Sequence, residues 1–268
     1  MMVLEFKGHG TIVVRRMEIR DVEQVIALVA QRIEEDQVSG RSRRLGPISR
    51  ETLVLSFEEF SGLSVVLEDA ARKAIVGCAL VTLFEPLEAD PTIPDLSVAE
   101  AAKLTLDHPL FGTRAAPVLH ALRIVGVALL PRLGGNPIKL YYNVLSGNER
   151  QLDHLADFKL ERTEPDGYVG AVLAQRASRI DLEGQKILSF ALTETSLRHS
   201  VELLLNVLAD RVFSRSDRRT DTPTVEAWPL EFAHPLLTDE LPILITLADE
   251  LQVAVPKELL RRKRPAGG

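Results

Sequence analysis

The sequence predicts an α/β fold of the α+β kind, in which helices flank a mixed, mostly antiparallel central sheet and a helical extension follows at the C-terminus. Two observations support this fold class. Up to Ala177, short β-branched or apolar runs alternate with segments whose apolar residues recur at helical spacing. Beyond Ala177 the alternation stops and only helical spacing remains. We therefore expect a sheet-containing domain over residues 1–177 and a helical C-terminal extension over residues 178–268.

The first half of the domain has the pattern strand, helix, helix, hairpin. Residues 11–16 form a short β-branched run, and residues 22–33 carry apolar side chains whose spacing places them on one helix face. Residues 49–60 repeat the helical spacing with a leucine and two phenylalanines. The apolar runs 63–67 and 74–84 flank a short polar turn, so they predict an antiparallel hairpin.

Two more strands are predicted after an insertion. Residues 85–117 mix prolines with acidic residues, which predicts a segment outside the core sheet with one helix over residues 98–106. The apolar runs 119–130 and 138–145 then predict two strands, which the stretch PRLGGN separates.

The domain ends with a helix and a hairpin, and the extension contributes further helices. Residues 148–158 have helical spacing, and residues 159–162 and 168–175 flank the turn sequence PDG, which predicts a hairpin. In the extension, apolar stripes over residues 197–212 and 244–251 predict helices. These stripes carry more apolar surface than a lone helix needs, so we expect them to pack on the sheet or on a second subunit. On that basis we predict a homodimer.

Composition and charge exclude several classes of function. With 46% hydrophobic residues, 26% charged residues and a net charge of -6, the chain has the composition of a folded protein without a general attraction to nucleic acid or anionic membranes. Its longest apolar runs are shorter than the roughly 20 residues that span a bilayer, and residues 1–10 lack an apolar signal core. Cys78 is the single cysteine and cannot form an internal disulfide. We expect a cytoplasmic protein that binds neither nucleic acid nor membrane.

Common motifs for metal, nucleotide and ester chemistry are absent from the sequence. The histidines lie far apart and none has the short spacing of a metal site, so no metal is predicted. There is no phosphate-binding P-loop, no dinucleotide fingerprint and no nucleophile elbow.

Three stretches resemble the GNAT superfamily of N-acetyltransferases. IVGCALVTLF is similar to the family's third strand, and IVGVALLPRLGG is similar to its fourth strand and pyrophosphate loop. YYNVLSGNERQLDHLADFKLERT is similar to the fifth strand, the helix after it and the next strand. The order of the predicted elements is also similar, and the resemblance covers Thr11 to Arg176.

This resemblance implies an enzyme that transfers an acyl group from acetyl-CoA or another acyl-CoA to an amine. In the family, the loop after the fourth strand has glycines that let backbone N–H groups approach the pyrophosphate, and it opens a helix whose N-terminus favours anions. Here Pro137 leads into a strand-like run, so we expect that helix to be absent. The alternative is that the two glycines only turn the chain between two strands. The resemblance implies these residues at the acyl-CoA site: Val127, Leu129, Arg132, Gly134, Gly135 and Asn148.

The resemblance also implies a proton donor for the departing CoA thiolate. The family uses a tyrosine seven residues beyond the asparagine, where this chain has Leu155 with His154 beside it. Tyr141 or Tyr142 would supply the hydroxyl instead, and we take Tyr142 as the candidate; the alternative that each tyrosine only packs in the core or on the sheet surface stays open. Because Tyr141 and Tyr142 are neighbours on a strand, they point to opposite faces, and at most one of them faces a cleft.

A general base for the amine is the remaining role. In the family it is commonly a carboxylate on or near the fourth strand, and His120 or Glu85 would take that place here. A lone histidine on a strand is also a common hydrogen-bonded structural residue, and that alternative stays open for His120.

Three functions follow as hypotheses. The first is an acyl-CoA-dependent N-acyltransferase that acts on a small-molecule or protein amine. The second is a catalytically inactive GNAT-fold scaffold or regulatory protein, in which residues 85–117 and the helical extension bind a protein partner. The third is a small-molecule sensor that keeps a remnant pocket.

Overall fold

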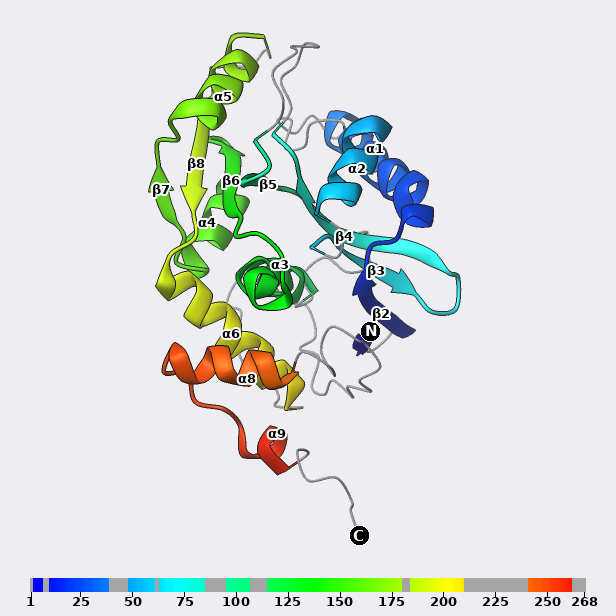
Figure 1. The fold of residues 1–268 in the computed structure, drawn as a ribbon. Helices are drawn as coiled ribbons and strands as arrows, with labels where there is room; N and C mark the ends of the chain where they lie inside the picture. Colours follow the sequence, from blue (N-terminus) through cyan, green and yellow to red (C-terminus); the bar gives the residue numbers. More distant parts are fainter. Residues whose placement is uncertain are drawn as a thin grey trace.

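The computed structural model describes residues 2–6, 10–38, 48–60, 63–84, 95–106, 115–179, 184–209 and 241–261 (Figure 1). The strands are β1 (Met2–Phe6), β2 (Gly10–Arg16), β3 (Val65–Asp69), β4 (Ala74–Thr82), β5 (Val98–Leu106), β6 (Lys139–Leu145), β7 (Glu161–Thr163) and β8 (Ile187–Ala191). The helices are η1 (Ile19–Asp21), α1 (Val22–Val38), α2 (Arg50–Glu59), α3 (Ala115–Leu129), η3 (Leu130–Leu133), α4 (Glu149–Asp157), α5 (Gly167–Arg179), α6 (Glu194–Leu208), α8 (Leu241–Glu250) and α9 (Lys257–Arg261).

The described strands form one mixed sheet in the order β1-β2-β3-β4-β5-β6-β8-β7. Every neighbouring pair is antiparallel except β5 and β6, which run parallel. Parallel neighbours need a crossover connection, and α3 supplies it. The α/β fold class predicted from the sequence is confirmed.

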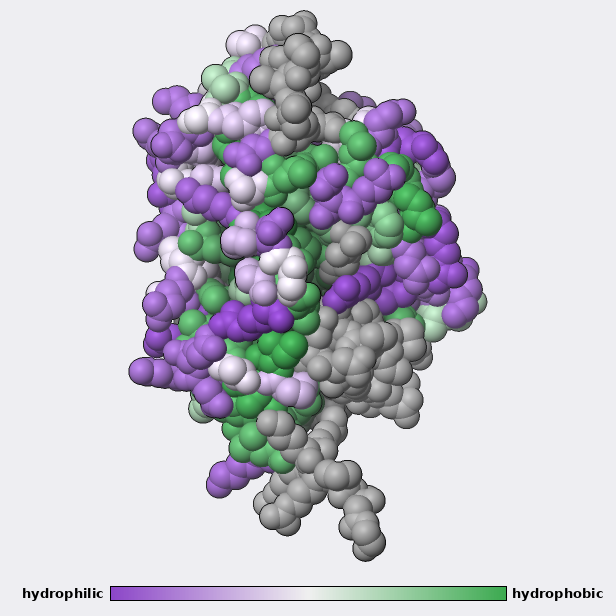
Figure 2. All heavy atoms as spheres, viewed as in Figure 1, coloured by the Kyte–Doolittle hydropathy of each residue, from purple (hydrophilic) through white to green (hydrophobic). Residues whose placement is uncertain are grey.

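Two larger apolar clusters cover the two faces of the sheet, and a smaller one lies under α5. On one face α1 and α2 bury Val25 and Leu53 against Val66, Cys78 and Leu80 of the sheet. On the other face α3 lies between the sheet and α6, and α8 packs outside α6 (Figure 1). The turn of the β3–β4 hairpin projects beyond the helices that cover the sheet (Figure 1), and hydrophilic residues lie on its visible face (Figure 2).

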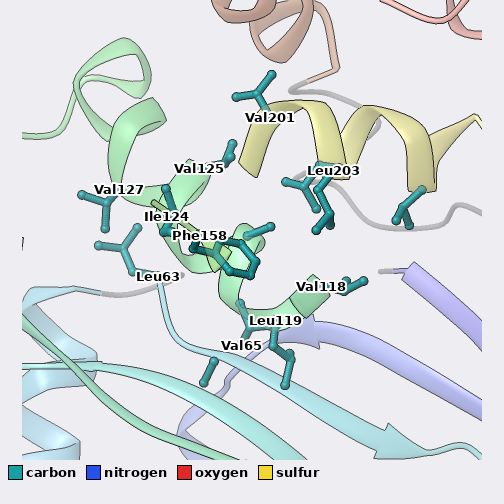
Figure 3. Close-up of a cluster of buried hydrophobic side chains, with 14 of the residues drawn as sticks. Leu63, Val65, Val118, Leu119, Ile124, Val125, Val127, Phe158, Val201 and Leu203 are labelled. Carbon is teal, nitrogen blue, oxygen red and sulfur yellow. The ribbon is translucent and has the colours of Figure 1, made fainter. Parts of the chain in front are cut away.

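Helix α3 is the centre of the larger cluster. Its side chains reach in both directions: Leu119 lies beside Val65 of β3, and Val125 lies toward Val201 of α6 (Figure 3). Together with η3 it forms a run from Ala115 to Leu133 that is apolar enough to span a membrane by length and composition, the one such run among the described residues. A core helix passes the same test, and this run packs between the sheet and α6.

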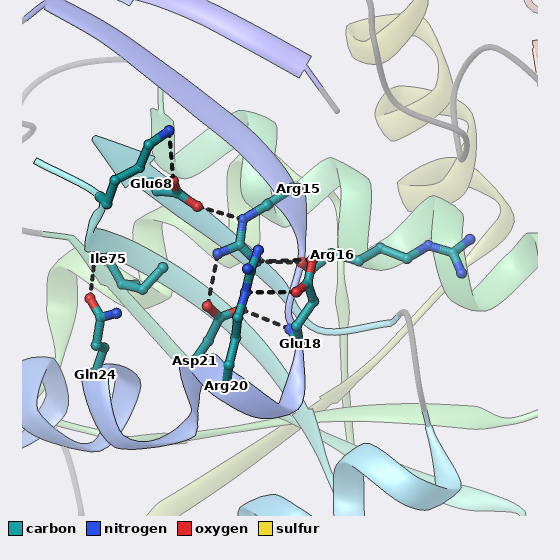
Figure 4. A network of polar contacts seen from close by, with 9 residues as sticks. Arg15, Arg16, Glu18, Arg20, Asp21, Gln24, Glu68 and Ile75 are labelled. Atoms are coloured by element: carbon teal, nitrogen blue, oxygen red, sulfur yellow. Dashed lines mark hydrogen bonds and ion pairs between the residues drawn. The ribbon is translucent and has the colours of Figure 1, made fainter. Parts of the chain in front are cut away.

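A polar network fixes α1 to the sheet edge (Figure 4). Arg15 of β2 donates to both carboxylate oxygens of Asp21, at 2.6 and 2.7 Å, and to Glu68 of β3 at 2.7 Å. Asp21 in turn accepts from the backbone N–H of Glu18 at 2.7 Å, which caps the start of the helical segment. The Asp21 hydrogen bond is the main cause that raises the pKa of Arg15, so one side chain holds together β2, β3 and the start of α1.

The structure corrects three predicted elements. Residues 98–106 are not a helix but the central strand β5, whereas residues 119–130 are not a strand but most of α3 with the first residue of η3. Residues 168–175 lie in helix α5 rather than in a hairpin, although residues 161–163 do form the strand β7. In each case the apolar or alanine-rich run is compatible with both helical and strand spacing, and packing against other elements determines which structure forms.

The predicted boundary after residue 177 also changes. It falls inside α5, and β8 at Ile187–Ala191 then pairs with both β6 and β7 in the central sheet. The chain beyond residue 177 therefore begins with a sheet strand. The predicted helices of the extension are present as α6 and α8.

Candidate active site at the β5–β6 opening

The parallel strands β5 and β6 are hydrogen-bonded at one end only. Their register runs from Val98 opposite Lys139 to Glu100 opposite Tyr141 and then stops. Beyond that point residues 101–106 of β5 continue to pair with β4, and residues 142–145 of β6 continue to pair with β8. The sheet therefore divides between β5 and β6, and we call residues 101–106 and 142–145 the β5–β6 opening.

A bulge in β5 lies beside this opening. The register between β4 and β5 shifts at Lys103, whose φ of 34° lies in the left-handed region. Arg123 of α3 reaches the bulge and donates to the carbonyl oxygens of Ala102, at 2.8 Å, and Leu80, at 3.1 Å. An arginine from the crossover helix thus stabilises the two strands where their regular ladder is interrupted.

Arg123 belongs to a buried polar cluster on the α3 side of the opening. Its guanidinium lies 4.9 Å from the ring centroid of Tyr142, and its Nη2 lies 3.2 Å from Nδ1 of His120. The His120 ring is 4.9 Å from the Tyr142 ring and 4.6 Å from the His154 ring of α4. We call these four residues the His120 cluster. Tyr142 and Arg123 are 1% exposed and His120 is fully buried.

Burial sets the protonation states in the cluster. It lowers the pKa of His120 well below the usual value, and the positive charge of Arg123 adds to that shift. It lowers the pKa of His154 to about 4. Burial raises the pKa of Tyr142, which the nearby Arg123 opposes only in part. Near neutral pH the cluster therefore holds two neutral imidazoles, one neutral phenol and one guanidinium.

A second polar group lies on the opposite face, under α5. Glu100, the last residue of β5 that pairs with β6, accepts from Asn143 at 2.9 Å and from Arg176 of α5 at 2.8 Å. Asn143 also accepts from Ser189 of β8 at 2.7 Å. Burial alone would raise the pKa of Glu100, but Arg176 outweighs it and holds the pKa below its usual value. This carboxylate is therefore charged and already paired.

The structure brings together two of the three predicted catalytic residues. His120 and Tyr142 are neighbours in the His120 cluster, although His120 lies on a helix rather than on a strand. Tyr142 and Tyr141 do face opposite sides, since Tyr141 packs against Phe84 in the cluster under α5. Glu85 lies outside the described residues.

The residues predicted to bind acyl-CoA occupy different places. Val127 and Leu129 lie on α3 and are buried in the core, so they are not part of a strand as expected. Arg132 of η3 forms an ion pair with Glu250 of α8. Asn148 caps α4, where its side chain accepts from the backbone N–H of Gln151 at 3.3 Å.

Gly134 and Gly135 lie at the closed end of the β5–β6 pair, because the chain runs directly from them into the hydrogen-bonded start of β6. Gly134 has a φ of 86° and caps the C-terminal end of η3. It therefore turns the chain, here between a short helix and a strand. The chain enters β6 after Gly135 and not a helix, whereas the crossover helix α3 follows β5 and begins at Ala115.

Sequence reasoning missed three charged residues of the two polar groups. Glu100 was hidden because its strand was predicted as a helix, and Arg176 because its helix was predicted as a strand. Arg123 left a usable signal, since it is the lone charged residue in the apolar run from Ala115 to Leu130. A charge in such a run must find buried partners. Among the described residues no group of three or more metal-ligating side chains occurs.

A surface pocket of about 510 Å³ lies at the closed end of the β5–β6 pair. Its lining residues are Ser97, Pro137, Ile138, Lys139, Leu140, Ala191 and Leu192. Lys139 is the one charged side chain among them, and no acid or base faces it from the rest of the lining. The pocket therefore lacks the paired groups that acid–base chemistry needs.

No family model matches the sequence, and no curated protein matches it. Solved structures do match it at low sequence identity. The NatC complex bound to Gag peptide and CoA is 14% identical, with a TM-score of 0.43 over 68% of this chain and 99% of that chain. A GNAT-family acetyltransferase from Listeria monocytogenes is 12% identical, with a TM-score of 0.43 over 68% of this chain and 95% of that one.

N-acetylglutamate synthase from Neisseria gonorrhoeae, complexed with coenzyme A and N-acetyl-glutamate, is 19% identical with a TM-score of 0.42. The match covers 68% of this chain and 35% of that chain. The described part of this chain has one mixed sheet with a single parallel pair, β5 and β6, which separates beyond Glu100. The crossover helix between these two strands begins at Ala115.

Proposed function

We propose that this chain is an acyl-CoA-dependent N-acyltransferase whose reacting thioester lies at the β5–β6 opening. The observation that carries the proposal is the position of Tyr142. It is the first residue of β6 beyond the last pair with β5, and its buried hydroxyl meets no hydrogen-bond partner in good geometry among the described residues, with Arg123 as its charged neighbour. A buried phenol without a partner is costly to the fold, which favours a role in chemistry over a role in packing.

In the proposed reaction Tyr142 is the proton donor. The amine nitrogen forms a bond to the acyl carbon, the carbon–sulfur bond breaks, and the electron pair goes to the sulfur. The phenol then gives its proton to the sulfur, and the proton released by the amine restores the phenol through solvent. Burial keeps the phenol protonated until the thiolate forms, because it raises the pKa of Tyr142.

The other predicted residues fit the proposal unequally. His120 adjoins Tyr142 and is neutral, so it stays a candidate for proton transfer within the cluster. Glu100 is the carboxylate on the strand that leads into the opening, but its pairing with Arg176 makes it a weak base. The start of α3 at Ala115 follows the open end of β5, and its N-terminus favours the CoA pyrophosphate.

The proposal is tested by measuring acetyl-CoA binding by calorimetry and CoA release in the presence of amines. Tyr142→Phe removes only the hydroxyl, so we expect unchanged acetyl-CoA affinity and a fall in kcat of about 100-fold or more. The matched control is Tyr141→Phe, which removes the same atom from the opposite face of the strand and should leave kcat within a few-fold of the parent. Equal kcat in both variants would refute the role of Tyr142.

A catalytically inactive scaffold is the second candidate, and one observation favours it. His120, Arg123 and Tyr142 are sealed from solvent, so acyl-CoA reaches them only if the opening widens. Under this hypothesis neither acetyl-CoA nor a longer acyl-CoA produces heat at millimolar concentration. The α6 and α8 helices would then present a surface to a protein partner.

A further inference from the structure

The carboxylate of Glu100 is held in place by hydrogen bonds that cross three strands. Ser189 of β8 donates to Oδ1 of Asn143 in β6 at 2.7 Å, and Nδ2 of Asn143 donates to Oε1 of Glu100 in β5 at 2.9 Å. Because Asn143 lies in the β5–β6 opening, these bonds join β5 to β6 beyond their last backbone pair. The sheet alone therefore fixes the position of this negative charge.

The second oxygen of the carboxylate binds a cation from α5. Nη1 of Arg176 donates to Oε2 of Glu100 at 2.8 Å, and the two side chains are 19% and 14% exposed. The guanidinium also lies 5.8 Å from the ring centroid of Phe84. Lys103 lowers the pKa of Glu100 less than Arg176 does. A shielded carboxylate beside an aromatic ring favours an ammonium or guanidinium group, and α5 supplies the cation that fills this site.

Helix α5 is attached by a small apolar cluster of its own. It buries Val169, Val172 and Leu173 there, whereas α3 and α6 share the main core. Tyr168 in its first turn donates to the backbone carbonyl of Phe84. In Figure 1, α5 lies at the end of the sheet remote from α6. Elements with few buried apolar contacts open at lower cost than the core, so α5 opens more easily than α3 or α6.

The cation held by Glu100 lies next to the residues that the proposed reaction uses. Glu100 pairs with Tyr141 in the backbone ladder, and Tyr142 follows directly. Since Tyr141 faces the cluster under α5, Glu100 lies on the face of the opening that is remote from the His120 cluster. An alkylamine is protonated near neutral pH. An amine that reaches the opening from the α5 face therefore meets Glu100 with the same charge that Arg176 carries.

We infer that Arg176 occupies the place of the acceptor's protonated amine and that α5 is a lid which the acceptor displaces. This inference rests on the proposed function, and it names the acceptor as a protonated alkylamine. When α5 moves, Glu100 exchanges a guanidinium for an ammonium, so its charge stays paired. The bound amine loses its proton before it attacks the thioester. Arg176 determines specificity by competition, because an acceptor without a positive charge cannot replace it on Glu100.

The lid is tested by titrating the full chain with n-butylammonium and with its neutral counterpart n-butanol, followed by the NMR shifts of the β5 and β6 amides. Arg176→Ala removes the competing cation, so the Kd for n-butylammonium should fall about tenfold or more. The affinity for n-butanol should not change. An ion pair that only attached α5 predicts the opposite sign, because its loss would loosen the site and weaken binding.

The matched control is Arg198→Ala on α6. It breaks the ion pair between Arg198 and Glu194, whose side chains are 45% and 71% exposed. This variant should leave the Kd for n-butylammonium within about twofold of the parent, because an exposed pair far from the site has little influence. Glu100→Gln should abolish binding of the cation in a chain that still folds by circular dichroism.

Hydrogen exchange in the unmodified chain gives a second measurement. Because n-butylammonium displaces Arg176, it should speed exchange of the α5 amides and leave the α3 amides unchanged, whereas n-butanol should do neither. This measurement requires no variant, so it decides the matter if Arg176→Ala does not fold.

The outcomes distinguish the lid from the function on which it rests. An equal or higher Kd in a folded Arg176→Ala chain, or unchanged α5 exchange, would overturn the lid. If that chain still releases CoA from acetyl-CoA, the acyltransferase proposal stands. A chain that binds n-butylammonium as expected but never binds acetyl-CoA would support the cation site and refute the acyltransferase.

Discussion

The half-buried imidazole of His154, whose Nε2 is shielded from solvent, makes the stability of this protein sensitive to mild acid. Its pKa is about 4 in the folded chain, chiefly because of burial, and about 6.5 when unfolded. Between these values the unfolded chain binds more protons, so stability is complete above about pH 6.5 and falls as the pH falls toward 4. The shift corresponds to about 3 kcal/mol.

This predicts that His154→Gln reduces the loss of unfolding free energy between about pH 6.5 and about pH 4.5, measured by urea titration. The histidine pKa values lie below the interval from about pH 7 to about pH 8. In that interval the unfolding free energies of the parent and of His154→Gln should therefore change equally with pH, which serves as an internal control. Parallel curves at acid pH would show that His154 is not buried as a neutral ring. His120, whose pKa is lowered in the same direction, accounts for the remaining dependence.

The sequence points to individual site residues better than to their surroundings. Tyr142 and His120 were both candidates, and they are neighbours in the fold. Their contact depends on how α3 packs across the face of the sheet, which no local pattern encodes. Arg123 was detectable as a lone charge in an apolar run. Glu100 was not, because the position of its carboxylate in the sheet depends on the pairing of β5 with β6.

Among the elements, those with a clear amphipathic pattern were predicted correctly and those with a uniform apolar pattern were not. The helices α1, α2, α4 and α6 and the hairpin β3–β4 agree with prediction. Helix α3 is apolar on nearly every side because the sheet and α6 cover it from two directions, so it has no polar face to reveal its period. Strand β5 has three alanines, two leucines, a glutamate and a lysine, and its pairing overrides their helical propensity.

The attachment of α1 to the sheet depends on one arginine. Arg15→Met would leave Asp21, which is 2% exposed, and Glu68 without their shared partner. We expect a loss of about 3–5 kcal/mol of unfolding free energy, because breaking a buried ion pair leaves uncompensated charge. Denaturant unfolding monitored by circular dichroism measures this loss.

The matched control for Arg15→Met is Arg50→Met. It breaks the ion pair between Arg50 and Glu23, whose side chains are 63% and 70% exposed. An exposed pair of this kind contributes at most about 1 kcal/mol. Similar losses in the two variants would contradict the importance of burial in the Arg15 network.

The chain beyond residue 177 shares its sheet and its core with the chain before it, although the sequence suggests a separate helical extension. The predicted division after residue 177 followed the change from mixed to purely helical spacing. In the structure the chain beyond it returns to the sheet as β8 and then covers α3 with α6. The apolar stripe of α6 is therefore buried within the same chain, and the homodimer stays a prediction that light scattering can test.

This continuity predicts one cooperative unfolding transition rather than two. Leu204 of α6 is fully buried against the α3 layer, so Leu204→Ala should lower the unfolding free energy by about 2–5 kcal/mol. Leu260→Ala in α9 is the control, since this side chain is 47% exposed and its loss should cost under about 1 kcal/mol. Far-UV and near-UV circular dichroism should report the same shifted midpoint in Leu204→Ala, because the sheet and α6 share one core. A separate early transition confined to the helical signal would show that the region beyond residue 177 unfolds independently of the sheet.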